Sequence, residues 1–308
     1  DGSALTGTPP LWDNRPIEPL ACPRERFVFS TGAMSRTTML KNLWRSLACS
    51  AVALTSLATP TLNAATPLAP PVKVAFVYVS PVGQAGWTYQ HNQGRLAMEA
   101  EMGPLVKTTV VEAVAEGADS ERVMRDLAAQ GNQLIFATSF GYLEPALRVA
   151  AEFPGAKFEH AGGYKTAANL NTYNARYYEA RYLAGMIAGH ASSSGVAGYV
   201  AGFPVPEVVQ GINAFTLGMR SVNPKAEVKV IWLNAWFDPA RERDAALTLV
   251  GQGADVLTNH SGSPAVPQVA EEKGVKLLAY QSDMSQFAPT AQLAAVTHHW
   301  GPYYLHAV

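Results

Sequence analysis

Residues 72–80 have the sequence VKVAFVYVS, a run in which only Lys73 carries a charge. A short apolar run rich in β-branched residues is typical of a strand that a parallel sheet buries on both faces. Helical spacing follows over residues 87–103 and ends at the Gly103–Pro104 pair, a common helix stop. The stretch therefore predicts a strand followed by a helix, the repeating unit of an α/β protein.

The alternation of strand and helix continues along the chain and then begins again. Strand–helix alternation indicates parallel sheets with right-handed crossovers, and two successive rounds predict two doubly wound, Rossmann-like lobes. The further strands that we expect lie at 107–114, 133–139, 157–161, 170–174, 196–202, 228–234, 256–259, 276–281 and 293–299. The chain ends inside what its pattern indicates is the start of a helix, so we expect a truncated carboxyl end.

The amino-terminal part has the features of a secretory signal peptide. Beginning at Met34, three basic residues precede an apolar stretch over 46–62, and the small residues Ala64 and Ala65 follow it. We predict that 34–65 is a cleaved signal peptide, cut after Ala64 or Ala65, and that the mature protein is periplasmic. Residues 1–33 are then expected to be non-native upstream translation.

Charge and cysteine usage exclude several classes of function. The formal net charge is -1, so no basic field points to a nucleic-acid partner. Cys22 and Cys49 lie before or within the predicted signal, which leaves the mature chain without a disulfide or a metal thiolate. The residues before Cys49 fit a lipid-attachment motif poorly. No HExxH pattern is present, so we expect neither a metal site nor a cofactor.

Catalytic motifs are also missing. Ser139, His260 and Asp283 are the types of residue found in a nucleophilic triad, but Ser139 lies in ATSFG and not in the GxSxG pattern of a nucleophile elbow. No GxxxxGK[ST] segment is present, and AGG at 161–163 lacks the dinucleotide fingerprint. We therefore expect a protein that is not an enzyme.

Candidate ligand-binding residues follow from the predicted strands, because ligands of open parallel sheets bind beyond the carboxyl ends of the strands. Aromatic walls with a few polar groups predict a small-molecule site, and stacking a base on an aromatic ring contributes about 1–3 kcal/mol. Structural roles are the alternative: Trp87 could fix a helix start, Trp236 could plug a loop, and Asp283 could cap a turn. The candidates are Ser80, Trp87, Thr88, Tyr89, Ser139 and Phe140 in the first lobe, and Gly202, Phe203, Trp236, His260 and Asp283 in the second.

Residues from Val72 to Val308 resemble the basic membrane protein family of ABC-transporter substrate-binding proteins, also called the purine nucleoside receptor type. The most specific segments are GWTYQHNQGR at 86–95, FATSFGYLEPAL at 136–147, NARYYEARYLAGMIAG at 174–189 and LLAYQSDMS at 277–285. The resemblance implies a type I periplasmic-binding fold, a purine-type ligand held between two lobes, and a permease partner in the inner membrane.

The same resemblance implies a hinge of three strands, expected near 174–178, 282–287 and 297–301. We accordingly assign 66–176 and 283–297 to the N-terminal lobe, and 177–282 and 298–308 to the C-terminal lobe. Ligand would stack on Trp87, and closure would bring in Trp236 and Asp283 from the second lobe.

Departures from the family pattern bear on the ligand. The loop after the first strand, SPVGQAG, lacks the usual acid, Thr88 stands where Asn is common, and Gln281 replaces one acid of a pair that keeps Asp283. These polar groups serve the ribose in nucleoside binders, so we favour a purine nucleobase such as adenine over a nucleoside. The alternatives are another small aromatic solute, or a receptor subunit that signals ligand occupancy.

Overall fold

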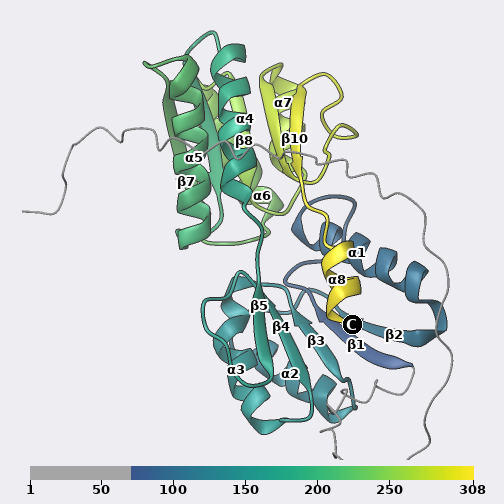
Figure 1. Ribbon diagram of the computed structural model, residues 1–308. Coiled ribbons are helices and arrows are strands. Elements are labelled where there is room, and N and C mark those ends of the chain that lie inside the picture. Colours follow the sequence, from purple (N-terminus) through teal and green to yellow (C-terminus); the bar gives the residue numbers. More distant parts are fainter. Residues whose placement is uncertain (1–70) are drawn as a thin grey trace, which may run out of the picture. The chain divides into compact units, whose positions relative to one another are not determined.

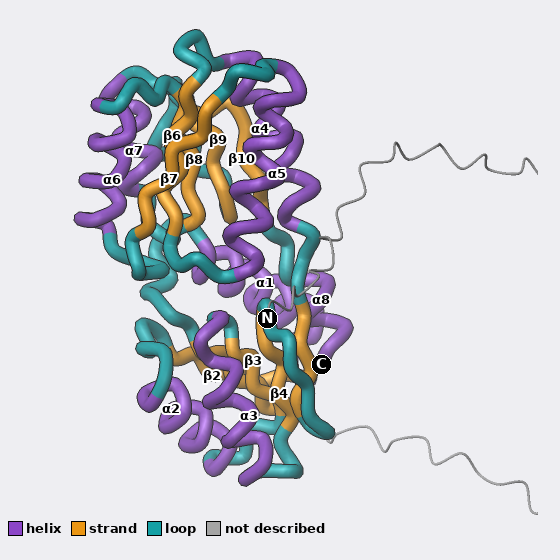
Figure 2. Tube along the Cα trace, turned by 90° about the vertical axis from the view of Figure 1, so that its left-hand side faces the viewer, coloured by secondary structure: helices purple, strands orange, loops and turns teal. Residues whose placement is uncertain are grey.

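The computed structural model describes residues 71–308. Within them, ten strands form two separate five-stranded parallel sheets, and helices cover both faces of each sheet (Figures 1 and 2). The two rounds of strand and helix predicted from the sequence are therefore confirmed as two doubly wound lobes. The predicted signal peptide over 34–65 and the upstream segment 1–33 lie outside the described residues.

The first lobe is built on the strand order β2-β1-β3-β4-β5. Pairing is parallel throughout, with Val74 opposite Thr108 on β2 and Leu134 on β3. Its elements are β1 (Val72–Val77), α1 (Trp87–Met102), β2 (Val106–Val111), α2 (Ala118–Ala129), β3 (Leu134–Ala137), α3 (Leu143–Glu152), β4 (Lys157–Ala161) and β5 (Leu170–Tyr173).

The second lobe has the strand order β10-β9-β8-β6-β7. Helices α6 and α7 cover one face of this sheet, and α4 and α5 cover the other (Figure 2). Its elements are α4 (Tyr177–Ala191), β6 (Val196–Ala201), α5 (Pro206–Val222), β7 (Glu227–Trp232), α6 (Pro239–Gly251), β8 (Val256–His260), α7 (Ala265–Lys273), β9 (Lys276–Gln281) and β10 (Gln292–Thr297).

The assignment of the last segments to lobes was wrong. Strand β10 pairs in parallel with β9, Ala295 opposite Ala279, so the chain stays in the second sheet through the predicted hinge segment 282–287. It then crosses back over residues 298–300 to α8 (Gly301–Ala307), which packs on α1 of the first lobe (Figure 1). Within residues 71–308 two segments, 174–176 and 298–300, therefore connect the lobes.

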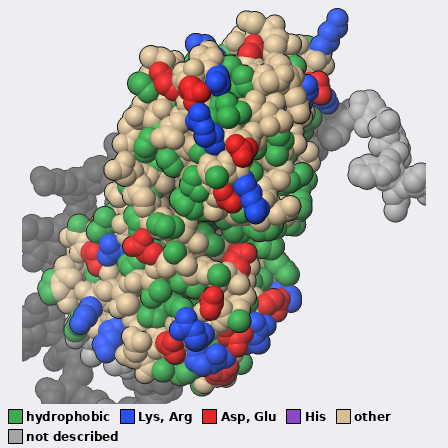
Figure 3. Space-filling model, turned by 180° about the vertical axis from the view of Figure 1, so that it is seen from behind, with side chains coloured by type: hydrophobic (Ala, Val, Ile, Leu, Met, Phe, Trp, Pro, Cys, Tyr) green, Lys and Arg blue, Asp and Glu red, His purple; other side chains and the backbone are tan. Residues whose placement is uncertain are grey.

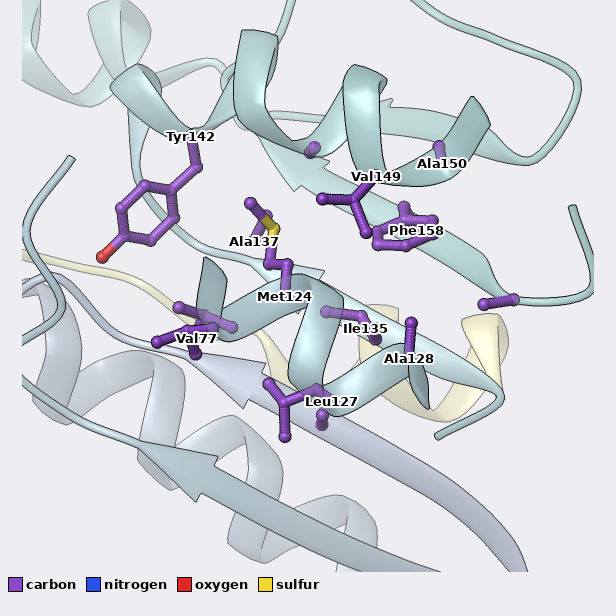
Figure 4. Close-up of a cluster of buried hydrophobic side chains, with 14 of the residues drawn as sticks. Val77, Met124, Leu127, Ala128, Ile135, Ala137, Tyr142, Val149, Ala150 and Phe158 are labelled. Carbon is purple, nitrogen blue, oxygen red and sulfur yellow. The ribbon is translucent and has the colours of Figure 1, made fainter. Parts of the chain in front are cut away.

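Each lobe has its own hydrophobic core. Figure 4 shows the one under α2 and α3, where Met124, Ile135, Val149 and Phe158 point toward one another from two helices and two strands. All four side chains are almost wholly removed from solvent. Burying a large apolar side chain contributes about 1.5–3 kcal/mol, so each lobe contains enough apolar contact to hold its strand ends in fixed positions.

Helices α4 and α5 approach each other closely because glycines lie at their contact. A methyl group added at Gly185 would overlap the carbonyl oxygen of Phe215, and one added at Gly218 would overlap that of Tyr182. The two backbones therefore touch directly, with no side chain between them at these points.

The surface carries a mixture of charges. Acidic and basic side chains are interspersed on the face in Figure 3, with apolar side chains between them. Several charges are paired, as where Arg125 lies 2.7 Å from Glu121 and 2.6 Å from Glu152. Exposed pairs of this kind contribute at most about 1 kcal/mol, so they leave the fold dependent on its cores.

Candidate ligand-binding site

A cavity of about 540 Å³, solvent at its mouth included, lies where the carboxyl ends of strands from both sheets meet. This is the position at which open parallel sheets bind ligands. Thirteen residues line it: Val79, Ser80, Trp87, Ser139, Phe140, Ala161, Gly162, Val205, Glu207, Trp236, His260, Gly262 and Gln281.

Trp87, at the start of α1, forms the aromatic wall on the first-lobe side. Its indole N–H donates a 2.7 Å hydrogen bond to the carbonyl oxygen of Thr138. Behind it lie His91, with ring centroids 4.5 Å apart, and His298, at 5.6 Å, both meeting the indole edge to face. The ring is therefore fixed in orientation before any ligand binds, which reduces the entropy lost on stacking.

Trp236 provides an aromatic surface from the second lobe. A Cβ at Gly202 would lie 2.7 Å from the Trp236 ring, so the absence of a side chain there lets the indole pack against the backbone. The ring of Phe203 meets the indole edge to face at 4.9 Å. Gly202 and Phe203 therefore support Trp236 and lie outside the cavity lining.

Glu116, in the loop after β2, links the two lobes and was not predicted. Its Oε1 accepts hydrogen bonds from the Ser139 hydroxyl (2.7 Å), the Gly141 N–H (2.8 Å) and the Trp236 indole N–H (3.0 Å). The first two donors belong to the first lobe and the third to the second. One carboxylate thus positions the two side chains, Ser139 and Trp236, that line opposite sides of the cavity.

Glu207, at the start of α5, is the carboxyl group of the cavity lining. Its Oε2 lies 3.4 Å from the Asn174 amide nitrogen, and its Oε1 lies 3.6 Å from His260 Nε2. Burial raises the pKa of Glu207 to about 7, and the hydrogen bond from Asn174 opposes that rise only in part. Its side chain therefore carries a proton much of the time near neutral pH.

Two further polar groups complete the lining. Burial, together with the charge of Arg181, holds the pKa of His260 well below its usual value, so the imidazole is neutral. Its Nδ1 has no hydrogen-bond partner among residues 71–308, and the same holds for Gln281 Oε1. Gln281, at the end of β9, has a φ of 72°, a backbone conformation that is uncommon for residues other than glycine.

Arg181, fully buried on α4, supports the strand ends below the cavity. It donates to the Thr258 hydroxyl at 2.9 Å and to the Asn259 carbonyl oxygen at 2.5 Å. Its guanidinium lies 3.4 Å from the ring centroid of Tyr280, a cation–π contact. Arg181 therefore fixes the ends of β8 and β9, which carry His260 and Gln281.

The structure brings six of the eleven predicted residues into the cavity lining. They are Ser80, Trp87, Ser139, Phe140, Trp236 and His260. Thr88 is buried and bonds to Ser80 through the two hydroxyls, at 2.7 Å, while Tyr89 lies on α1 outside the lining.

Asp283 also lies outside the lining. Its carboxylate accepts from the Gln292 side chain (2.7 Å) and the Ser285 N–H (2.9 Å), which lower its pKa. Because the chain stays in the second sheet after β9, Asp283 closes a turn of the β9–β10 loop.

Neither a metal cluster nor a membrane helix is found in the described part of the chain. No group of three or more His, Cys, Asp or Glu side chains over 71–308 is placed to hold an ion. In the same range no helix is long and apolar enough to cross a membrane.

The fold and the cavity define a class: two-lobed α/β proteins that hold a small molecule at the carboxyl ends of both sheets. The chain belongs to the Bmp family, whose model, described as ABC transporter substrate-binding protein PnrA-like, matches residues 71–308. The resemblance stated from sequence is therefore confirmed. A solute-binding protein of Aeropyrum pernix K1 shares the fold, with a TM-score of 0.67 at 20% identity over 77% of this chain and 70% of that one.

Two curated relatives are more similar in sequence. A purine-binding protein of Brucella abortus (strain 2308) is 55% identical over 76% of this chain and 67% of its own length. A putative ABC transporter glucose-binding protein of Haloferax volcanii is 44% identical over 76% of this chain and 59% of its own length. The chain thus spans about two thirds or less of these relatives.

Proposed function

We propose that this chain is the periplasmic solute-binding component of an ABC importer and that it binds a purine base or nucleoside between its lobes. Its family is one of ABC transporter substrate-binding proteins. The 55% identical relative is named a purine-binding protein. The ligand is bound and released unchanged, and an inner-membrane permease receives it. Export through the signal peptide predicted over 34–65 delivers the protein to the periplasm.

The observation that carries the purine assignment is the pair of tryptophans. Trp87 from the first lobe and Trp236 from the second line one cavity, together with Phe140. Flat heteroaromatic rings gain about 1–3 kcal/mol from stacking on such a side chain. Both indole N–H groups are already bonded, to Thr138 and Glu116, which leaves the ring surfaces for a ligand.

The polar lining supports a base in preference to a nucleoside. Of the thirteen lining residues, all within the described range, Glu207 is the one carboxyl-bearing side chain. Asp283, which the family pattern offers for a ribose hydroxyl, is committed to Ser285 and Gln292.

Contacts between the lobes supply a mechanism of capture. Besides the bond from Trp236 to Glu116, the Gly86 N–H donates to the Ser282 hydroxyl at 2.7 Å, and Gln286 donates to the Gln84 carbonyl oxygen at 3.1 Å. These contacts hold the arrangement in which both tryptophans line the cavity. A ligand that touches both lobes binds this closed arrangement more tightly than an arrangement with the lobes apart. The difference between the two affinities sets how far the ligand favours closure.

Thermal unfolding of the full chain with adenine, guanine, adenosine, guanosine and glucose tests the function. A ligand that binds only the folded state stabilises it by about 2.7 kcal/mol at a concentration 100 times Kd, and this stabilisation raises the midpoint temperature of unfolding. A shift with adenine or guanine, and a smaller one with the nucleosides, supports the proposal. No shift with any purine rules it out.

A monosaccharide is the second candidate, because the 44% identical relative is named as glucose-binding. Sugars also stack on indole rings, so the tryptophans alone do not decide the matter. Titration calorimetry with glucose and adenine separates the two ligands. Glucose binding tighter than adenine binding favours this candidate, and the reverse order favours the purine.

A further inference from the structure

Glu207 is the polar side chain best placed to recognise the edge of a stacked base. It lies among the residues that line the cavity with Trp87 and Trp236. It also lies beside the first lobe, with Gly162 as its neighbour there. A Cβ added at Gly162 would lie 3.2 Å from the Glu207 Oε2. A carboxyl group at this place lies at the perimeter of a ring held between the lobes, where the hydrogen-bonding atoms of a purine are found.

The surroundings of Glu207 favour its neutral form. Its polar neighbours are an amide, Asn174, and a neutral imidazole, His260. No Lys or Arg nitrogen within residues 71–308 lies within 4.0 Å of it. A buried carboxylate without a cation is costly, so the proton is retained and the pKa rises to about 7.

Groups that could disturb this balance surround Glu207 on four elements. Tyr177 on α4, Tyr199 on β6 and Tyr280 on β9 all have a raised pKa because of burial and stay neutral. His298, on the return crossover, has a pKa of about 3, again through burial, and is neutral as well. Arg181 keeps its charge and is bound to β8. Glu207 is therefore the group that changes charge near pH 7.

A neutral carboxyl group offers a donor and an acceptor side by side, as the amide of Gln does. An amide of this kind pairs with adenine through its amino group and the adjacent ring nitrogen. A 6-oxopurine such as guanine also offers a complementary pair, since its O6 acceptor lies beside its N1–H donor, so the neutral carboxyl group can pair with either class of base. An ionised carboxylate, with two acceptors, would instead match the two donors of guanine.

We propose that Glu207 is the specificity-determining residue of the cavity: its protonated carboxyl group pairs with the edge of a purine base, and loss of that proton removes the pairing with adenine while leaving one with guanine. This inference rests on the proposed function. It makes affinity for adenine decline as the pH rises. Above pH 7 the free protein must gain a proton to bind, which weakens binding by about tenfold per pH unit.

The test is calorimetric binding of adenine and guanine to the full chain and to Glu207→Gln, Glu207→Ala and Asp283→Asn, between pH 6 and 8.5. Glu207→Gln should bind adenine at pH 6 within about threefold of the unmodified protein, and Glu207→Ala about 5- to 150-fold more weakly. Binding by Glu207→Gln should not change with pH. Asp283→Asn, altered outside the cavity, should behave like the unmodified protein throughout.

Other outcomes overturn the inference and separate it from the proposed function. If the unmodified protein binds adenine but Glu207→Ala binds it equally well, Glu207 does not contact the base. If Glu207→Gln is as weak as Glu207→Ala while its unfolding midpoint is unchanged, the charged form is the one required. Both failures leave the purine assignment standing, whereas no purine binding by the unmodified protein overturns the assignment and the inference together.

Discussion

The indole N–H of Trp236, in the loop after β7, donates a 3.0 Å hydrogen bond to the Glu116 carboxylate, in the loop after β2 of the other lobe. The same carboxylate oxygen accepts from the Ser139 hydroxyl and from the Gly141 N–H. The bond from Trp236 is therefore made only when the two lobes are in contact, in addition to the support that Gly202 and Phe203 give the ring from its own lobe.

Replacing Glu116 should weaken ligand binding without unfolding the protein. Glu116→Ala removes one hydrogen bond to Trp236 and two that hold the first-lobe loop, so we expect adenine to bind about 2- to 10-fold more weakly. Combining it with Trp236→Phe in a double-mutant cycle isolates the cross-lobe bond. Additive losses in the cycle would mean that the two residues act independently.

Replacing Trp87 should cost more affinity than any other aromatic substitution in the first lobe. Trp87→Ala removes one stacking surface, worth about 1–3 kcal/mol, so we expect the Kd for adenine to rise about 5- to 150-fold. Trp232→Ala provides the control, because Trp232 is 37% exposed on β7 and does not line the cavity. Equal losses in the two variants, measured by calorimetry, would remove Trp87 from the site.

Gly86 should be required for contact between the lobes. Its φ is 94°, and a methyl group there would overlap the carbonyl oxygen of Gly262 in the second lobe. Gly86→Ala should therefore weaken adenine binding by opposing closure. Gly83→Ala is the matched control, since Gly83 also has a positive φ, 60°, with nothing within 4 Å of the added carbon.

Small-angle scattering distinguishes the two glycine variants directly. In the unmodified protein and in Gly83→Ala, saturating adenine should reduce the radius of gyration. In Gly86→Ala that reduction should be smaller at equal occupancy. An equal reduction in both variants would show that the contact between Gly86 and Gly262 does not limit closure.

The buried histidines should make the protein less stable in mild acid. Burial lowers the pKa of His160 to about 4 and that of His298 to about 3, against a usual value of 6.5. As the pH falls below 6.5 the unfolded chain takes up protons that the folded chain refuses. The free energy of unfolding should therefore fall by about 1.4 kcal/mol per pH unit for each such histidine until its folded pKa is reached.

Denaturant unfolding between pH 4.5 and 7.5 measures this slope. His160→Gln should reduce the slope below pH 6.5 by about 1.4 kcal/mol per pH unit, the contribution of one histidine, relative to the unmodified protein. Glu207 acts in the opposite direction, because its raised pKa stabilises the folded state at lower pH. A slope that is unchanged in His160→Gln would mean that this side chain takes up its proton in the folded protein.

The sequence was sufficient for the sheets and for much of the cavity. Regular alternation of apolar runs and helical spacing predicted both lobes, and residues near the carboxyl ends of strands, such as Ser80, Ser139 and His260, proved to line the cavity. Gln281 was not among the predicted site residues, although it ends a predicted strand and the same rule could have found it. Glu207 begins a predicted helix after a strand, a position that also faces the crevice of such sheets.

Other features depend on contacts that no local pattern records. Glu116 lies in an irregular loop, and its role comes from Trp236, 120 residues further along the chain. Asp283 follows β9 as the rule for ligand residues requires, yet the pairing of β10 with β9 turns its carboxylate into a loop contact. That pairing, a property of the whole sheet, also decides which lobe the last strand joins.

The direct backbone contact between α4 and α5 has a mechanical consequence. The chain enters the second lobe through residues 174–176 and passes at once into α4, and α5 begins with the segment that carries Glu207. Because glycines bring these helices together without intervening side chains, neither helix can slide or tilt independently of the other. A rotation at the crossover would therefore move α4 and α5 as one body and carry Glu207, at the start of α5, with them.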